Sequence, residues 1–406
     1  MGFEPTVRRT YDGFQDRSVM TTSVSLRICL MILPHRIEIV KCFLQKIFIF
    51  SVFTFFTCND IIVKKIRETK PMTIIATILR VLISAIVTLL TIIAPWAPSL
   101  SPYKPLDKDA CLLNFAAISD THYESDEHDP EDAVYSDITH NVYMPNLKQG
   151  SDKLDALVIA GDITDHGYAS QWDRAEDILT SYDVADEMIL AMGNHDLWTR
   201  DEQGRTSKGL FLQYNKRITG KYVSDAYYST EVNGYPFIVL CSEADETDGY
   251  FTDKQIKWLK KELKKAAKKD LPIFVICHWP LNQTHGLPVT FGDDEYTEMT
   301  GGMGENSARI ERLLKKYDNV FLISGHIHIG FSNAEDEAKT GYRSIESDGS
   351  FHSINLPRIN AMTKIGYPMM GTGYNVEVYE DKVVFRARNY AMNTWVPKYD
   401  CTIELV

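Results

Sequence analysis

The sequence lacks the cysteine patterns that mark redox motifs and structural zinc sites. Its seven cysteines form no Cys-x-x-Cys pair and show no zinc-ribbon spacing, so neither class of site is indicated. Cys241 and Cys277 lie inside apolar runs of strand length, where a buried free thiol is commoner than a disulfide. We therefore expect reduced, inert thiols.

The sequence also lacks nucleotide-binding loops, internal repeats and a basic stripe. No P-loop and no Gly-x-Gly-x-x-Gly follows any strand-like run. The net charge of −12 is unevenly placed, because residues 1–71 hold 11 Lys and Arg against 6 Asp and Glu, while the rest of the chain holds 32 against 49. A body this acidic repels polyanions. This disfavours nucleic acid as a partner and leaves small phosphate esters open.

One long apolar run lies near the N-terminus. Residues 73–97 are almost continuously apolar, interrupted by Arg80, and their length is near the ~20 residues needed to cross a bilayer. A basic cluster at residues 64–70 precedes the run and favours an N-terminal flank inside the cell. We therefore predict an uncleaved transmembrane or signal-anchor segment over residues 72–98. The chain would be membrane-anchored, with everything after it on the extracytoplasmic side.

Met72 opens a stretch that resembles a signal or anchor by itself, and this leaves two interpretations of residues 1–71. They are a basic N-terminal extension outside the native product, or a disordered basic tail with an interfacial segment. A proline-rich linker follows the apolar run over residues 99–110. The predicted folded domain covers residues 111–406, and at 44% apolar content the chain can bury a large core.

Past the linker, apolar runs of strand length alternate with helix-like segments. The runs are nearly continuous in apolar residues, as expected of strands buried on both faces in an α/β fold. The tail, residues 371–406, alternates instead and predicts antiparallel hairpins that finish a sheet. The predicted strands are 112–119, 156–160, 188–192, 236–241, 273–277 and 320–324, and the predicted helices are 171–182, 252–268 and 306–317.

Five of these runs are followed at once by residues that can bind a metal. In open α/β sheets the carboxyl ends of the strands line the crevice where ligands bind, so the five groups should converge. A single Asp-x-His or a lone His is more often structural, but five such groups in order indicate a functional site. The groups are Asp120 with His122; Asp162; Asn194 with His195 and Asp196; His278; and His326 with His328.

The order D-x-H, G-D, G-N-H-D, H and G-H-x-H resembles the calcineurin-like metallophosphoesterases, over about residues 112–330. The resemblance implies a four-layer αββα sandwich with mixed β-sheets and a pair of divalent metal ions bridged by Asp162. A tyrosine-ligated iron site is not expected, because Ile163 follows the G-D pair and D-x-H stands where such enzymes have D-x-G. The implied ligands are Asp120, His122, Asp162 and His328 for one ion, and Asp162, Asn194, His278 and His326 for the other.

The ligand types agree with this resemblance independently. Imidazole, carboxylate and amide ligands suit Mn, Fe or Zn, and the absence of thiolate argues against a purely structural zinc. Two such ions can activate a hydroxide and stabilise the phosphoryl oxygens of an in-line displacement. We therefore predict hydrolysis of a phosphomonoester or phosphodiester. His195 would donate a proton to the leaving oxygen, with Asp196 orienting its ring.

Other polar residues near the groups are candidates for supporting roles. Asp165 and His166 follow Asp162 closely, and such a carboxylate often accepts the second N–H of a metal-bound histidine. A loop capped by its own Asp explains these two residues equally well. Candidates for contact with the substrate, on loops just beyond predicted ligands, are Glu124, Asp126, His128, Asn282 and His285.

Two other functions are compatible with the same motifs. A binding scaffold that has lost catalysis is disfavoured, because the set of ligands and the histidine of G-N-H are complete. A nuclease is disfavoured by the acidic body and the absence of a basic stripe. Among hydrolases, the D-x-H and G-N-H-D pattern resembles small bacterial phosphodiesterases acting on cyclic nucleotides, whereas an outward-facing enzyme would meet extracellular nucleotides or envelope phosphate esters.

Overall fold

The computed structural model divides the chain into two units, Met1–Leu100 and Ser101–Val406. The predicted membrane segment at 72–98, the extension before it and residues 99–104 of the linker lie outside the described residues. Within the described part, no helix combines the length and apolarity needed to span a bilayer. The structure describes residues 105–147, 153–198, 205–244, 247–291, 300–363 and 365–406.

The first sheet is mixed. It contains β1 (Leu113–Ile118), β2 (Leu154–Ala160), β3 (Ala185–Ala191), β10 (Thr372–Val378), β11 (Lys382–Asn389), β12 (Thr394–Trp395) and β13 (Cys401–Glu404). The order is β12-β11-β10-β1-β2-β3, and β13 also pairs with β11. β1 runs parallel to β2 and antiparallel to β10, so the hairpins predicted in the tail complete the sheet that β1 begins.

The second sheet is also mixed. It contains β4 (Tyr228–Val232), β5 (Tyr235–Val239), β6 (Ile273–Ile276), β7 (Val320–Ser324), β8 (Ile345–Asp348) and β9 (Phe351–Asn355). The order is β4-β5-β6-β7-β9-β8. The four central strands are parallel, and the two edge strands pair with them antiparallel. The carboxyl ends of β6 and β7 therefore meet at one edge of this sheet.

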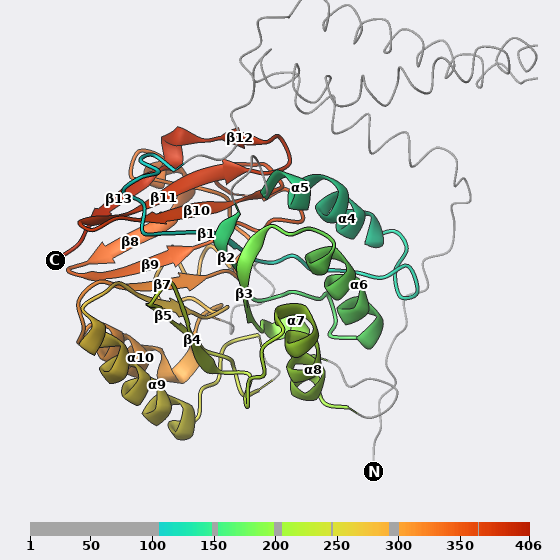
Figure 1. Ribbon diagram of the computed structural model, residues 1–406, viewed down its shortest axis with the longest axis horizontal. Coiled ribbons are helices and arrows are strands. Elements are labelled where there is room, and N and C mark those ends of the chain that lie inside the picture. Colours follow the sequence, from blue (N-terminus) through green and yellow to red (C-terminus); the bar gives the residue numbers. More distant parts are fainter. Residues whose placement is uncertain (1–104, 148–152, 199–204, 245–246, 292–299, 364) are drawn as a thin grey trace, which may run out of the picture. The chain divides into compact units, whose positions relative to one another are not determined.

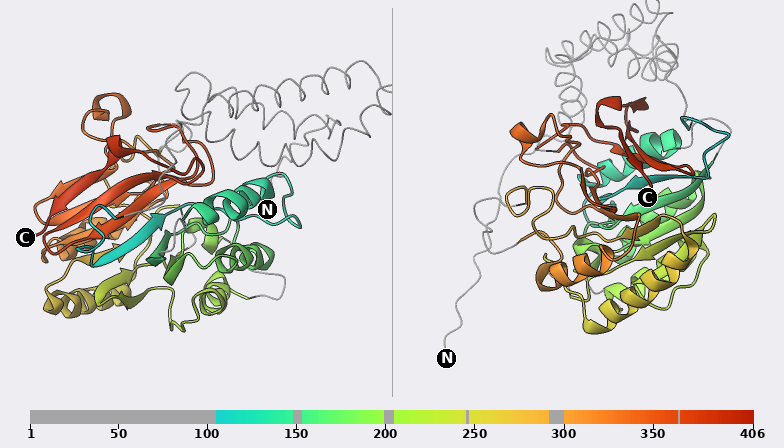
Figure 2. Two further views of the ribbon diagram at one scale, coloured as in Figure 1. Left: turned by 45° about the horizontal axis from the view of Figure 1, so that its top comes forward. Right: turned by 90° about the vertical axis from the view of Figure 1, so that its left-hand side faces the viewer.

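Helices cover the outer face of each sheet (Figures 1 and 2). Against the first sheet lie α4 (Ala133–Ile138), η2 (Thr139–Tyr143), α5 (Met144–Leu147), α6 (Ala169–Thr180), α7 (Asn194–Leu197) and α8 (Ser207–Thr219). Against the second lie α9 (Asp253–Ala266) and α10 (Ser307–Leu314). The remaining helical turns are η3 (Ala267–Lys269), η4 (Gly304–Asn306), α11 (Glu337–Thr340) and η5 (Pro397–Tyr399).

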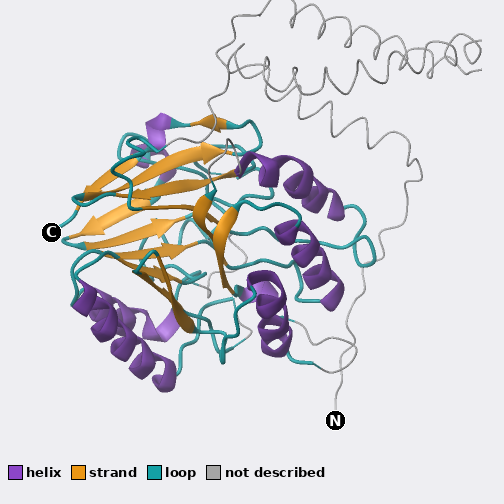
Figure 3. Cartoon of the chain, viewed as in Figure 1, coloured by secondary structure: helices purple, strands orange, loops and turns teal. Residues whose placement is uncertain are grey.

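The strands are buried on both faces, as their continuous apolar runs predict. In β1, Phe115 and Ala117 point into the core between the two sheets, whereas Ala116 and Ile118 point into the core beneath the helices of the first sheet. A third core lies between α9, α10 and the second sheet. This alternation produces the predicted αββα order of layers, which Figure 3 shows with helices outside the strands.

Each of the six predicted strands and three predicted helices is present, with ends shifted by a few residues. The structure adds elements that the apolar pattern does not reveal, among them α8 and β9. All five residues of β9 are buried although His352, Ser353 and Asn355 are polar. Hydrogen bonds compensate for this burial, since Asn355 Nδ2 donates to Gly325 O at 2.6 Å.

Candidate metal centre

The predicted ligands converge where the carboxyl ends of the two sheets meet. Backbone bonds tie the neighbouring loops together, since His122 N donates to Asp162 O at 2.9 Å and Gly325 N donates to His278 O at 2.9 Å. The two sheets are joined directly, because His326 N lies 3.2 Å from Asp120 Oδ1. The ligands follow β1 (Asp120 and His122), β2 (Asp162), β3 (Asn194), β6 (His278) and β7 (His326 and His328).

The backbone at these strand ends is strained. Five of the predicted ligands have positive φ, a region that residues other than glycine rarely adopt. Such conformations persist where the surrounding structure enforces them, and they concentrate at functional sites. Here each one turns the chain off its strand and directs a side chain toward the same point. The residues and φ values are Asp120 (57°), His122 (42°), Asp162 (49°), His326 (75°) and His328 (51°).

A first ligand group consists of Asp120, His122, Asp162 and His328, whose ligand atoms all lie within 4.8 Å of one another. His328 Nε2 lies 3.1 Å from Asp120 Oδ1, and His122 Nε2 lies 3.6 Å from Asp162 Oδ2. The two Nε2 atoms are 3.3 Å apart. This is the set predicted for one metal ion.

A second ligand group consists of Asp162, His278 and His326, again within 4.8 Å, with Asn194 beside it. His278 Nε2 lies 3.1 Å from Asp162 Oδ2, 3.2 Å from His326 Nδ1 and 3.2 Å from Asn194 Oδ1. All four residues are buried. Asp162 belongs to both groups, as predicted for a bridging ligand.

The polar atoms of these groups fit bound cations. Among the described residues, Asp162 Oδ2 and His326 Nε2 are buried with no assigned hydrogen bond, although His278 Nε2 lies 3.1 Å from Asp162 Oδ2. Burial lowers the pKa of His278, but the charges of Asp162 and Asp120 outweigh it and raise the pKa to about 9. The two carboxylates therefore favour a positive charge at this point. Imidazole and carboxylate donors without thiolate match a divalent metal.

Comparisons with known proteins identify the family of the chain. The family model described as calcineurin-like phosphoesterase matches residues 113–330, more than half of the chain. The chain belongs to the calcineurin-like phosphoesterase family. Its relatives include a glycerophosphodiester phosphodiesterase of Enterobacter lignolyticus, 24% identical over 218 residues that cover 52% of this chain and 70% of the relative. A cAMP/cGMP dual specificity phosphodiesterase of Mycobacterium tuberculosis is 24% identical over 214 residues, covering 52% of this chain and 60% of the relative.

Among solved structures, a dimetal phosphatase from Danio rerio has a TM-score of 0.48 and 15% identity, covering 73% of this chain and 100% of that one.

In this calcineurin-like phosphoesterase, glycine at position 193 lets two strand ends approach closely. A Cβ atom there would lie 2.1 Å from Asp162 Oδ1 and 2.5 Å from Asp162 N. Real Cβ atoms essentially never come this near another heavy atom. Glycine before Asn194 is therefore a packing requirement of Asp162, the predicted shared ligand.

One histidine in each ligand group is held by a contact with a residue outside that group. Asp165 Oδ1 lies 2.9 Å from His122 Nδ1, and the backbone oxygen of Ala160 lies 2.9 Å from His278 Nδ1. Each contact fixes the ring and leaves Nε2 directed toward the centre. The predicted supporting role of Asp165 therefore agrees with the geometry, and His166 lies beside it with Nδ1 2.8 Å from Asp165 Oδ2.

His195 lies beside the first ligand group, outside it. Its ring is 4.4 Å from the ring of His122 and 3.8 Å from that of Trp198, measured between centroids. Nδ1 lies 2.7 Å from the backbone oxygen of Asp165. Because a carbonyl oxygen only accepts, Nδ1 carries the proton in this bond, and Nε2 remains available for a ligand.

The prediction that Asp196 orients the His195 ring is wrong, because that carboxylate is fully buried and engaged elsewhere. Asp196 accepts hydrogen bonds from the backbone of Gly193, Ile163 and Thr164 and from the Thr164 hydroxyl, at 2.7–3.0 Å. Asp196 instead holds the loop after β2 to the loop after β3. It thereby positions Asp162 and Asn194 relative to each other.

Two of the candidates for substrate contact have structural roles. His285 is fully buried, with Nδ1 2.8 Å from Arg343 O and Nε2 2.9 Å from Ser353 Oγ, so it cannot reach a substrate. Asn282 Nδ2 donates to Gly304 O at 2.9 Å and holds the glycine-rich loop.

The other candidates lie beyond His122. Asp126 is exposed. Glu124, His128 and His166 bring ligand atoms within 4.8 Å of one another. The Glu124 carboxylate already accepts from Gln171 Nε2 at 2.8 Å and lies 2.9 Å from His128 Nδ1. This group is therefore accounted for by its own hydrogen bonds.

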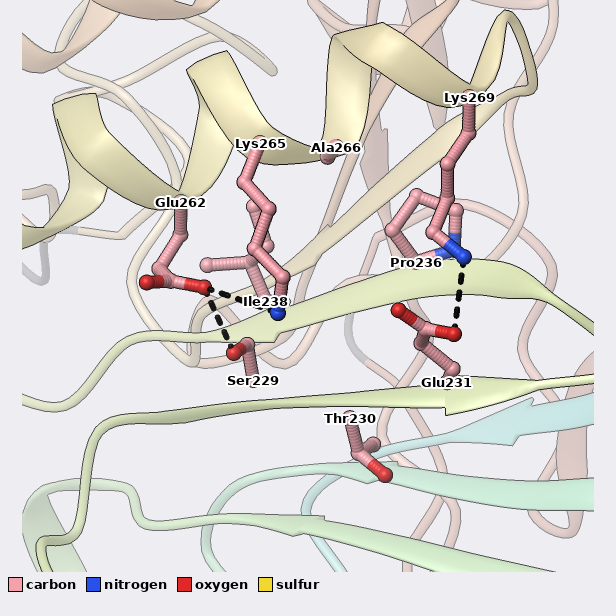
Figure 4. Close-up of a pocket in the computed structure, with 9 residues that line it drawn as sticks. All are labelled: Ser229, Thr230, Glu231, Pro236, Ile238, Glu262, Lys265, Ala266 and Lys269. Carbon is pink, nitrogen blue, oxygen red and sulfur yellow. Dashed lines mark hydrogen bonds and ion pairs between the residues drawn. The ribbon is translucent and has the colours of Figure 1, made fainter.

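A surface pocket of about 220 Å³ lies between α9 and the β4–β5 hairpin (Figure 4). The polar groups that line the pocket interact with one another. Lys269 Nζ lies 2.8 Å from Glu231 Oε2, and Ser229 Oγ donates to Glu262 Oε2 at 3.0 Å. Neither ligand group contributes a residue to its lining. The candidate functional site is therefore the metal centre at the strand ends.

Proposed function

We propose that this protein hydrolyses phosphate esters with two divalent metal ions, one in each ligand group. The observation that carries the proposal is Asp162, a buried carboxylate shared by two groups of ligand atoms. Bound there, the ions would lower the pKa of a water molecule and stabilise charge on the phosphoryl oxygens. Mn, Fe or Zn suits the imidazole, carboxylate and amide donors.

The protein's own residues divide the remaining tasks. The carboxylates of Asp120 and Asp162 hold negative charge beside the imidazoles, and Asp165 and Ala160 O fix the rings of His122 and His278. His195, whose Nδ1 donates to a carbonyl oxygen, would carry a second proton on Nε2 as an imidazolium and transfer that proton to the departing alcohol. We propose this role for His195 alone, since Asp196 acts on the loops.

Phosphodiesters are the better supported substrates within this class. The two relatives described above are named as phosphodiesterases. The chain has a net charge of −12, which disfavours extended nucleic acids and so a nuclease. A scaffold without catalysis is disfavoured because all seven predicted ligands are present and gathered at the strand ends.

Turnover of small esters tests this proposal. The purified protein would be assayed on p-nitrophenyl phosphate, bis(p-nitrophenyl) phosphate, glycerophosphodiesters and cyclic nucleotides, with Mn, Zn, Fe and Mg supplied in turn. We expect metal-dependent hydrolysis that a chelator abolishes and added metal restores. The matched control is the same protein after chelation without metal. Metal-loaded protein that turns over none of these esters would support the scaffold instead.

We further propose that residues 72–98 anchor the chain, with the phosphoesterase domain on the extracytoplasmic side. The support is the basic cluster before this apolar run and the excess of acidic residues after it. A reporter fused after Val406 should be active outside the cytoplasm, and protease added to intact cells should cleave the domain. A fusion that starts after residue 98 is the control. A cytoplasmic reporter signal with full protection from protease would contradict the anchor and the localisation together.

A further inference from the structure

Arg358 reaches the first ligand group from a segment outside the stretch that the family model matches, residues 113–330. The chain leaving β9 crosses from the second sheet to the first, where Ile359 N donates to Ser119 O at 3.2 Å. Arg358 lies at this crossing and forms a parallel bridge with Ser119, the residue before ligand Asp120. Its position is therefore set by the path of the chain between the sheets.

The guanidinium of Arg358 is fixed on the outer side of ligand His328. Nε donates to Asn360 Oδ1 at 2.5 Å, and Asn360 is itself buried. Nη1 lies 3.3 Å from His328 Nδ1, while His328 Nε2, across the ring, faces Asp120. Arg358 thus borders the first ligand group without belonging to it.

Among the described residues, the guanidinium of Arg358 forms no ion pair with a carboxylate, and its charge acts on the Asp132 carboxyl only from beyond ion-pair distance. Several arginines of the domain pair with acids, as Arg309 does with Asp253 and Arg343 with Glu337. Across the described ranges, no carboxylate oxygen lies within 4.0 Å of the Arg358 guanidinium. A partly buried charge without a partner is costly. An anion that enters the site would supply the missing partner.

The proposed ions would strengthen this demand for an anion. The two negative charges of Asp120 and Asp162 offset only half of the four positive charges on two divalent ions. These two carboxylates therefore have no negative charge left to neutralise Arg358. Arginine also suits the task chemically, because its planar guanidinium donates two parallel hydrogen bonds to phosphate oxygens and never loses its charge.

We propose that Arg358 is a substrate-binding residue whose guanidinium binds an anionic oxygen of the phosphoryl group, held in place by Asn360. This inference rests on the proposed function of the metal centre. The oxygen has two possible sources. A non-bridging oxygen is common to diesters and monoesters, whereas a third terminal oxygen is present only in monoesters.

The test replaces Arg358 by Met and by Lys in the full-length, metal-loaded protein, with Arg309→Met as the matched control at an arginine paired on the surface. We expect Arg358→Met to weaken the binding of inorganic phosphate about 10- to 100-fold, the range for a charge-assisted hydrogen bond. KM should rise by a similar factor. Arg358→Lys should recover part of the loss, because it keeps the charge without the planar fork. Metal content should stay the same in all three variants.

Phosphate affinity is measured by calorimetry, and KM and kcat on p-nitrophenyl phosphate and bis(p-nitrophenyl) phosphate. An equal rise in KM on both esters identifies a non-bridging oxygen as the bound atom, and a larger rise on the monoester identifies the third terminal oxygen.

Unchanged phosphate affinity in a metal-replete Arg358→Met protein overturns the role of Arg358 while the proposed function stands. Loss of metal that added metal repairs, with full phosphate affinity, makes Arg358 a support for His328 and also overturns it. If wild type hydrolyses no ester, the proposed function fails, yet the phosphate titration still decides on Arg358.

Discussion

Asp162→Asn is expected to abolish most activity and to lower the metal content below that of any other single ligand variant. The substitution preserves the shape of the side chain, and an amide oxygen can still accept from His195 N, which lies 3.0 Å from Asp162 Oδ1. The amide nitrogen would then replace Oδ2, the atom nearest to His278 and His122. A donor group cannot ligate a cation. Both ligand groups would therefore lose a ligand and a negative charge at once.

The measurement is metal content and turnover of Asp162→Asn beside His328→Ala, which removes one ligand from the first group only. We expect the loss of turnover in Asp162→Asn to exceed the roughly 10- to 100-fold that changes in outer-shell partners cause, and to exceed the loss in His328→Ala. Asp348→Asn is the control, because Asp348 is exposed and pairs with Lys315. Two bound ions and near-normal turnover in Asp162→Asn would show that the shared carboxylate does not bridge.

The positions of the candidate ligands could be predicted because local sequence determines them. An apolar run buried on both faces has a definite end, and a polar residue placed there must lie at the edge of the sheet. The order of strands does not matter for this argument. It holds for Asp120 after β1 as well as for His326 after β7, although the two belong to different sheets. The sharing of Asp162 followed only from the family resemblance, and the geometry agrees with it.

The partners of those ligands could not be predicted, because they depend on how distant loops pack. Asp196 follows His195 directly, and adjacency suggested a contact between their side chains. On the short helix α7, adjacent side chains point in different directions, so Asp196 reaches the loop after β2 instead. Arg358 is separated from His328 by β8 and β9. β9 is too polar to be recognised as a strand from an apolar run in the sequence. The sequence therefore did not reveal that the chain returns to the site after β9.

The second large effect is expected for His195→Ala, and it rests on the hydrogen bond between His195 Nδ1 and Asp165 O. This bond fixes the ring with Nε2 free, and it uses a backbone atom that no substitution at position 165 removes. His195→Ala should therefore leave both ligand groups intact, since the first lies beside the ring and does not include it. We expect unchanged metal content and a turnover lower by roughly 10²–10⁴, the usual contribution of a general acid.

The loss in His195→Ala should also depend on the leaving group. A p-nitrophenolate departs without a proton, whereas an alkyl alkoxide needs one, so hydrolysis of alkyl esters should fall much further than that of aryl esters. His140→Ala is the control, because the ring of His140 packs against that of Tyr182 and His140 lies outside both ligand groups. Turnover on aryl and alkyl esters, melting temperature and metal content would be measured on the same samples.

Equal losses of turnover on both esters with intact metal and stability would remove the acid role, and His195 would then act by stabilising charge on the phosphoryl group. A lower melting temperature with equal losses would instead identify His195 as a packing residue between His122 and Trp198.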